Sequence, residues 1–457
     1  MVRQTKPFSR AGVREHARQN IIRGELDFMK AWAFKSGITL MLIIMGGFTA
    51  AQPAAMSPRA YCANAKMGLF VHYTLGTYHD GHYGGTWTHP NGQPAADLNS
   101  VADSLDVKAL ADVAEGMGAQ YVIFTAYHAG MNLMYPSPFW EKALPNTVSN
   151  RDLIGDRADA LKAKRIPLIL YVHPDDRHDL TAEEQKRVMD IGYSAQVNIT
   201  EGSGRRPKDP TWQAAYVRLI DEIGSRYGGR IIGYWEDGGM SDGPTVKSVM
   251  LQHTPDAAIW KNGGWSGPPT TLIGSETENR KEQWAATVAG NWWASGGKIS
   301  RSPREMYRKT VLWAATQGQV NGGIAWAAGP YANNQWETGV AEAFKELGQL
   351  MRANAKAIYG TVASTSYVTS PDAQPEWGVA TDSADGSSVY LHVFDPPKDT
   401  SLQIGKASDG RVFHRATLLS NGKAVKLTAI DEGYVLTLPK AERWGDVDTV
   451  VCLAVEK

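Results

Sequence analysis

The chain has 457 residues, and its 47 Lys and Arg residues balance 47 Asp and Glu residues. A formal net charge of zero removes the electrostatic grounds for nucleic-acid binding, and the length suffices for a large α/β core plus a smaller domain. Fifteen Trp and eighteen Tyr residues supply flat aromatic faces, which suit apolar sugar faces as well as hydrophobic cores.

The N-terminal segment is typical of an export signal. After a basic stretch over 1–28, which we interpret as an upstream extension, Met29 opens a segment with a positive start, an apolar run and small residues up to Ala51. The apolar run is shorter than the roughly 20 residues that a membrane-spanning helix needs. We therefore predict a signal peptide over 29–51 and an exported bacterial protein, periplasmic or extracellular, with no membrane span in the mature chain.

The two cysteines, Cys62 and Cys452, stand at opposite ends of the predicted mature chain. A bridge between them is open in an oxidising compartment, but isolated thiols are more often buried and free. The sequence HPDDRHD over 173–179 resembles a metal site, yet its place before a helix suits capping or solvation better. We predict no metal and no cofactor.

From residue 66 onward, short apolar runs alternate with amphipathic stretches. Strands are predicted over 67–73, 121–126, 167–172, 230–235, 256–260, 270–274, 287–293 and 322–328, and helices over 106–119, 156–166, 211–228, 302–317 and 340–354. Continuous apolar strands separated by helices indicate a parallel sheet covered on both faces. Eight such units favour a (β/α)8 TIM-like barrel, here over 60–360.

After Thr361 the pattern changes to alternating strands with turn signals, over 387–397, 415–430, 433–441 and 448–457. This pattern is typical of an antiparallel β-sandwich, which we place over 362–457. The predicted fold class is therefore α/β, a (β/α)8 barrel followed by a C-terminal antiparallel β-sandwich domain.

Two adjacent acids, Glu236 and Asp237, follow directly on an apolar strand. Because side chains alternate along a strand, Asp237 shares a face with Trp235, while Glu236 points the other way. The two acids therefore cannot face each other as a catalytic pair, although glycosidic bond cleavage commonly uses two carboxylates. A partner has to come from another loop, and GSETEN supplies Glu276 and Glu278 after a later strand.

Other polar and aromatic residues stand at the carboxyl ends of the predicted strands, where barrels of this kind carry their chemistry. They are His72, Tyr127, His128, Tyr171, His173, Lys261, Asn262, Trp292 and Trp293. Each also has a structural interpretation. The acids could cap a helix or pair with a cation, His72 could be a packed histidine, and the tryptophans could belong to the core.

Six segments, KMGLFVHY, YVIFTAYHAG, RDLIGD, IIGYWEDGG, NWWASGG and NAKAIYGT, occur in an order that resembles the glycoside hydrolase family 29 α-L-fucosidases. The resemblance covers roughly residues 60–457. It implies a barrel plus sandwich and a retaining exo-glycosidase that removes terminal α-L-fucosyl residues from a glycan or glycoside by double displacement.

The resemblance also implies roles for single residues. Asp237 would be the nucleophile and Glu278 the acid/base, with Glu276 as the rival for that second role. The sugar would be held by His72, Trp87, His128 and Tyr171, and Lys261 and Trp293 complete the predicted substrate-binding set.

Three positions depart from the family pattern. Thr86 stands where the family has Glu, Ala129 where it has a second consecutive histidine, and Asn262 where it has Arg. A site that loses hydrogen-bonding partners discriminates differently between sugars, so the sequence supports the reaction type better than the sugar. Two alternatives stay open: a related retaining glycosidase for another sugar, and a non-catalytic glycan-binding protein. The oligomeric state is not indicated.

Overall fold

The computed structural model describes residues 56–73, 91, 93, 97–174, 180–191, 210–237, 244–262, 272–275, 284–294, 298–316 and 323–456. Eight parallel strands pair in chain order and close into a barrel, because the first strand also pairs with the eighth. The strands are β1 (Met67–Val71), β2 (Val122–Thr125), β3 (Leu168–Val172), β4 (Gly233–Glu236), β5 (Ala258–Asn262), β6 (Leu272–Ser275), β7 (Trp284–Val288) and β8 (Ile324–Ala327). The predicted barrel is confirmed.

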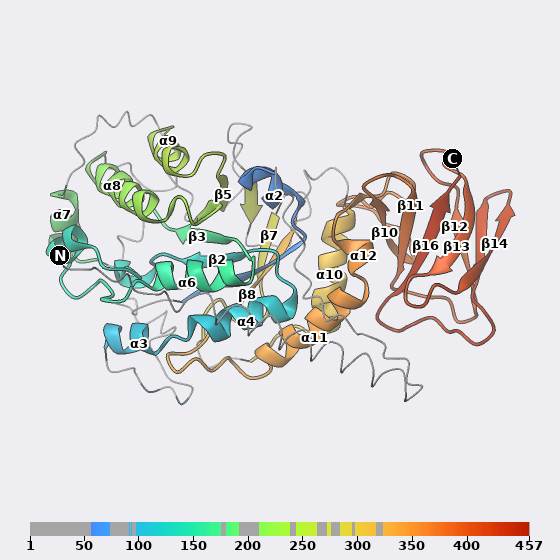
Figure 1. Cartoon of the computed structure of the whole chain (residues 1–457), viewed down its shortest axis with the longest axis horizontal. Helices are drawn as coiled ribbons and strands as arrows, with labels where there is room; N and C mark the ends of the chain where they lie inside the picture. The colour runs from blue at the N-terminus through green and yellow to red at the C-terminus, as the bar shows by residue number, and fades with distance from the viewer. Residues whose placement is uncertain are drawn as a thin grey trace, which may run out of the picture. The chain divides into compact units, whose positions relative to one another are not determined.

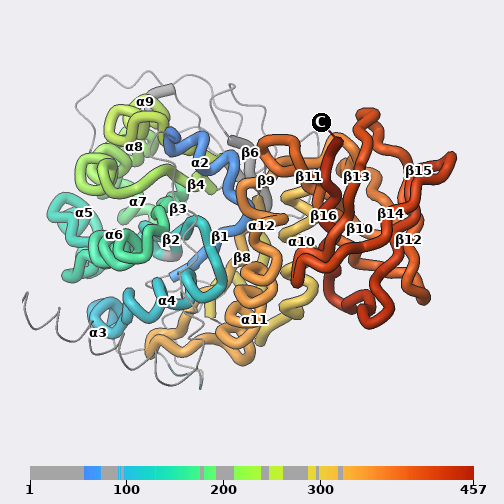
Figure 2. The backbone as a smooth tube through the Cα atoms, turned by 45° about the vertical axis from the view of Figure 1, so that its right-hand side comes forward, coloured from blue at the N-terminus to red at the C-terminus, as the bar shows by residue number. Residues whose placement is uncertain are grey.

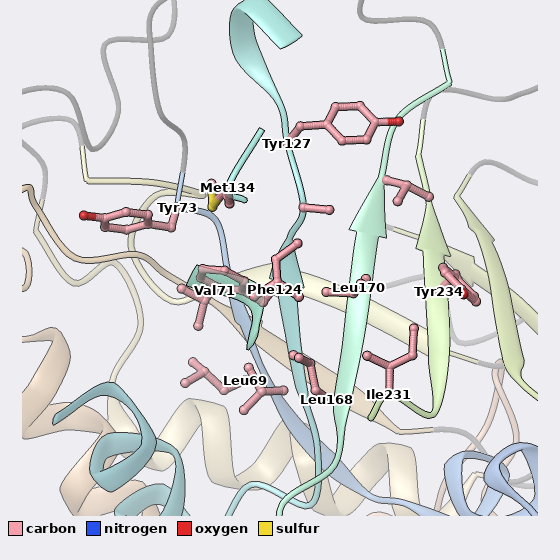
Figure 3. Close-up of a cluster of buried hydrophobic side chains, with 14 of the residues drawn as sticks. Leu69, Val71, Tyr73, Phe124, Tyr127, Met134, Leu168, Leu170, Ile231 and Tyr234 are labelled. Carbon is pink, nitrogen blue, oxygen red and sulfur yellow. The ribbon is translucent and has the colours of Figure 1, made fainter. Parts of the chain in front are cut away.

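Alternation along the strands divides the buried side chains into two sets. Outward residues form one cluster with apolar side chains of the surrounding helices, and Figure 3 shows part of it, including Leu69, Val71, Phe124, Leu168 and Leu170. Inward residues form a second cluster that fills the barrel, namely Phe70, Tyr121, Ile123, Ile169, Tyr171, Trp235, Ala258, Trp260, Ala325 and Ala327. The barrel is therefore a packed core, and its chemistry is confined to its ends.

The amino end of the barrel is closed by α2 (Pro58–Asn64), whose Tyr61 and Cys62 join the inward cluster. The Tyr61 hydroxyl donates to the carbonyl of Gln120, directly before β2, at 2.7 Å. Gly68 gives room for the neighbouring Tyr121 ring of the inward cluster, because a Cβ at position 68 would lie 2.1 Å from that ring. The candidate active site lies at the opposite, carboxyl end of the barrel.

Helices surround the strands and pack on one another, for example α4 on α6 and α8 on α9, which Figure 1 labels. They are α3 (Leu98–Ser104), α4 (Val107–Met117), α5 (Pro138–Ala143), α6 (Leu153–Ala163), α7 (Ala182–Met189), α8 (Pro210–Tyr227), α9 (Pro244–His253), α10 (Pro303–Ala315), α11 (Val340–Ala353) and α12 (Ala355–Ile358). Several begin at a side-chain cap, such as Asp106 before α4 and Ser302 before α10. No helix within the described ranges is long and apolar enough to cross a bilayer.

The predicted seventh strand over 287–293 is wrong in its position, since β7 ends at Val288. The chain turns after Ala289, whose carbonyl accepts the Ser300 N–H at 2.8 Å. Gly290 permits this turn, because a Cβ there would lie 3.0 Å from the Lys298 carbonyl oxygen. Trp292 and Trp293 therefore lie in a loop beyond the strand and not within it.

The C-terminal residues form one eight-stranded antiparallel sheet in the order β12-β15-β14-β13-β16-β11-β10-β9. The strands are β9 (Thr361–Ala363), β10 (Gly378–Ser383), β11 (Ser388–Val393), β12 (Ser401–Gly405), β13 (Phe413–Leu418), β14 (Ala424–Ile430), β15 (Gly433–Thr437) and β16 (Thr449–Val455). Side chains from both halves of the sheet share one core, and Figure 2 traces the strands around it. Strands β9, β10 and β12 carry no clear sequence signal, because those segments are short or interrupted by polar residues.

Helix α10 connects the barrel to this sheet through buried and half-buried polar contacts. The Tyr307 hydroxyl donates to Asp448 Oδ2 at 2.6 Å, and the same carboxylate oxygen lies 2.8 Å from His392 Nδ1. Arg308 Nε donates to the Val447 carbonyl at 3.0 Å. Cys62 and Cys452 are both free thiols, so the bridge between them is not formed.

Candidate active site

Asp237 lies at the carboxyl end of the barrel, on the inward face. Its backbone N–H donates to the Val172 carbonyl at 3.0 Å, which continues the ladder between β3 and β4 by one residue. The Tyr171 hydroxyl donates to Asp237 Oδ2 at 2.7 Å. Tyr171 and Trp235 both belong to the inward cluster, so Asp237 shares their face, as the alternation predicts.

Glu236 points in the opposite direction, toward the helix layer. It is buried, and its Oε1 accepts a hydrogen bond from the hydroxyl of Tyr216 on α8 at 3.2 Å. The two adjacent acids are therefore separated by the wall of the barrel. Of the two acids, Asp237 is the one on the inward side, beside Tyr171 at the carboxyl end of the barrel.

His72 follows β1 and packs against aromatic rings on several sides. Its ring centroid lies 5.1 Å from Tyr171, 5.2 Å from Trp292 and 5.7 Å from His128. The next residue is fixed to the end of β2, because the Tyr73 N–H donates to Thr125 Oγ1 at 3.1 Å. Burial lowers the pKa of His72 to about 4, although the nearby Asp237 carboxylate acts in the opposite direction. His72 is thus a neutral imidazole at neutral pH.

His128 follows β2 and is also buried. Its ring stacks on that of Tyr171 at 5.3 Å with an angle of 7° between the planes. The Tyr171 ring therefore has His128 against one face while its hydroxyl reaches Asp237. This packing leaves the phenol little freedom to turn away from the carboxylate.

Trp292 and Trp293 bring the loop after β7 against His72, with Trp293 at a centroid distance of 6.0 Å. Gly329, the second residue after β8, makes this approach feasible. A Cβ at Gly329 would lie 2.1 Å from the His72 carbonyl oxygen and 3.6 Å from the Trp293 Cα. A larger residue would push apart two of the segments that form the mouth.

Glu337 is a buried carboxylate that the sequence analysis did not identify. It lies in the loop after β8 and accepts a hydrogen bond from Asn291 Nδ2 at 3.3 Å, directly before the two tryptophans. The next residue, Thr338, accepts the Ile299 N–H at 2.9 Å. Glu337 therefore supports the loop that carries Trp292 and Trp293, and nothing in its local sequence signals that role.

Several predicted site residues lie outside the described residues, namely Trp87, Glu276, Glu278 and the altered position Thr86. The backbone of Lys261 and Asn262 belongs to β5, where Lys261 pairs in register with Glu236. The side chains of these two residues are not among those described. Of the metal-like stretch over 173–179, only His173 and Pro174 are described. Within the described ranges, no group of three His, Cys, Asp or Glu residues is arranged to hold a metal ion.

A profile of the family described as Alpha-L-fucosidase matches residues 50–295, which is more than half of the chain. The chain belongs to the α-L-fucosidase family. A curated relative, Alpha-L-fucosidase 1 of Arabidopsis thaliana, is 24% identical over 225 residues. That match covers 46% of this chain and 38% of the relative, so the chain spans well under half of the plant protein's length.

Solved α-L-fucosidases have the same fold. The isoenzyme 1 structure from Paenibacillus thiaminolyticus has a TM-score of 0.61 at 19% identity and covers 87% of this chain and 99% of its own. A family 29 enzyme from Bacteroides thetaiotaomicron, trapped as a covalent intermediate, has a TM-score of 0.62 at 16% identity, with coverages of 90% and 98%. The Thermotoga maritima enzyme has a TM-score of 0.61 at 14% identity, with coverages of 87% and 97%. These structures match both the barrel and the C-terminal sandwich.

In this family member, the buried neutral His72 should make folding sensitive to acid. The unfolded imidazole titrates near 6.5 and the folded one near 4, so the unfolded chain binds the proton more readily. The contribution of His72 is therefore fully present above pH 6.5 and is lost as the pH falls toward 4. At pH 5 the free energy of unfolding is lower by about 2 kcal/mol as a result.

Urea unfolding of the wild type and of His72→Phe at pH 7 and pH 5 measures this effect. The wild type should lose about 2 kcal/mol more than the variant between the two pH values. An equal loss in both proteins would mean that His72 is accessible to protons in the folded state.

Proposed function

We propose that this chain is a retaining exo-α-L-fucosidase that hydrolyses terminal α-L-fucosyl residues of glycans. The observation that carries the proposal is the position of Asp237, a carboxylate on the inward face at the barrel mouth that accepts a hydrogen bond from Tyr171. Membership of the α-L-fucosidase family supports the same activity. We also propose that the protein is exported, on the strength of the signal-like segment over 29–51.

In the proposed reaction, an ionised Asp237 attacks the anomeric carbon while Glu278 protonates the leaving oxygen. In this step the bond from the anomeric carbon to the leaving oxygen breaks as the glycosyl–Asp237 ester forms. Glu278, now a base, then takes a proton from a water molecule, which attacks the same carbon and releases the sugar and the Asp237 carboxylate. Glu278 follows β6, which ends at Ser275 in the same sheet, and Glu276 is the rival in the same loop. A retaining pair requires carboxyl groups roughly 5–5.5 Å apart.

Tyr171 and His72 would assist without exchanging protons with the leaving group. The Tyr171 hydroxyl stabilises the negative charge of Asp237 and fixes the direction of the attacking oxygen. His72, being neutral, offers the sugar a hydrogen bond without placing a positive charge beside the nucleophile. The half-buried Trp292 and Trp293 supply apolar faces for the sugar ring.

The three positions that differ from the family pattern favour a second candidate function, a retaining glycosidase for a related sugar. Thr86, Ala129 and Asn262 replace a carboxylate, an imidazole and a guanidinium of the family pattern. Because buried polar groups in a sugar site select for matching hydroxyls, these changes favour a related sugar as the alternative substrate.

A panel of aryl glycosides, tested on residues 52–457, separates these functions. Hydrolysis of the α-L-fucoside, with α-L-fucose as the first product anomer by NMR, supports the retaining fucosidase. Turnover of another glycoside alone selects the related-sugar enzyme. Binding of glycans without turnover of any glycoside contradicts both and leaves a glycan-binding protein.

Tyr171→Phe should lower kcat by about 10- to 100-fold, because the variant loses a hydrogen bond to a charged group at the reacting atom. KM should change little, since the phenyl ring keeps its packing against His128. Steady-state kinetics on the aryl glycoside that the wild type hydrolyses measures kcat and KM separately. A rise in KM at constant kcat would instead place Tyr171 in ground-state sugar binding.

A further inference from the structure

His173, directly after β3, lies on the same side of the strand as Tyr171. Tyr171 belongs to the cluster inside the barrel, and Val172 belongs to the outward cluster beneath the helices. By alternation the next residue returns to the inward side. The ring contact agrees, because the His173 centroid lies 6.1 Å from that of His128.

The backbone around His173 is held from two other elements. The Tyr127 hydroxyl, beyond β2, donates to the His173 carbonyl at 2.8 Å. Trp212 Nε1, on α8, donates to the carbonyl of the following Pro174 at 2.8 Å. The imidazole is therefore carried by a fixed segment, as a residue that contacts a ligand requires.

A capping role does not account for His173. The next described helix, α7, begins at its own cap, Thr181, which forms a capping box with Glu184. His173 is half-buried, whereas His72 and His128 beside it are buried. It is the most accessible of the three imidazoles that gather around Tyr171 and the mouth.

We propose that His173 is a sugar-contact residue that hydrogen-bonds one hydroxyl of the substrate. Its ring lies against that of His128, which follows the neighbouring strand β2. His173 thus gives the site a second imidazole beside His128, although the residue that follows His128 in this chain is Ala129. The proposal rests on the proposed glycosidase function and deepens it. His173 becomes a determinant of which sugar hydroxyl is read, through either ring nitrogen.

Kinetics with monodeoxy substrates test this role. On the aryl glycoside that the wild type hydrolyses, His173→Ala should lower kcat/KM by about 10- to 100-fold, mainly through KM. One substrate lacking a single hydroxyl should be affected much less by the same change, because the contact is already absent. His173→Gln should retain part of the activity through its amide. His414→Ala, an exposed histidine on β13, is the matched control and should behave as the wild type.

An equal loss on every deoxy substrate, or a change in kcat/KM of less than about 3-fold, would overturn the assignment. If the wild type hydrolyses no glycoside, the proposed function fails, and His173 is then tested by ¹⁵N NMR of its imidazole. A change in the His173 resonance when monosaccharides such as L-fucose or D-galactose are added supports the contact. An unchanged resonance with every sugar overturns it.

Discussion

Replacing Asp237 with Asn should abolish glycoside hydrolysis, with kcat/KM reduced by at least about 1,000-fold. The amide keeps the shape of the side chain but cannot form the glycosyl ester. Asp237 lies at the barrel mouth with Tyr171 as its hydrogen-bond donor, so the substitution leaves the surrounding core unchanged. Steady-state kinetics and a thermal melt together separate lost chemistry from lost folding.

The adjacent acid provides a matched control. Glu236→Gln makes the same chemical change one residue earlier, on the side of β4 that faces Tyr216 and the helices. It should retain activity within about 10-fold of the wild type, because the side chain does not reach the mouth. Equal losses in the two variants would mean that the strand end matters as a structural unit and would contradict a nucleophile at Asp237.

Removing the acid/base should produce a loss that depends on the leaving group. Glu278→Ala should lower kcat/KM by about 1,000-fold or more for a fucosylated sugar, whose leaving oxygen needs a proton. For a dinitrophenyl glycoside, which leaves without protonation, the first step should be nearly unaffected. Steady-state and burst kinetics on the two substrates measure this difference.

Glu276→Ala is the paired variant, since both acids stand in the loop sequence after β6. With Glu278 as the acid/base, Glu276→Ala should show no dependence on the leaving group. The reverse pattern would transfer the role to Glu276. Uniform losses on both substrates in both variants would contradict an acid/base in this loop.

The fold could be predicted because its signals are local and repeated. Each barrel strand is a short apolar run between helical segments, and the alternation rule gave the correct face for Asp237 from the position of Trp235 alone. The seventh strand was misplaced because Trp292 and Trp293 extend the apolar run past Gly290, where the chain turns. Strands β9 and β12 carry too few apolar residues to be seen without their neighbours in the sheet.

The site could be predicted only in part, because much of it depends on contacts between distant segments. Strand-end positions identify His72, His128 and Tyr171 as candidates, but not that His128 stacks on Tyr171 or that Tyr171 donates to Asp237. Glu337 has no local signal at all, since its role comes from a hydrogen bond to a loop 46 residues away. Such contacts are fixed by the closure of the barrel and not by any sequence pattern.

In the proposed mechanism, Asp237 is the group that becomes covalently bonded to the sugar. Incubation with 2-deoxy-2-fluoro-α-L-fucosyl fluoride slows release of the glycosyl enzyme, so that digestion and mass spectrometry can locate the bond. We expect one fluorofucosyl group per chain, attached to Asp237, and no labelling of Asp237→Asn. A label on another residue, or an active wild type that never carries the label, would contradict the central claim.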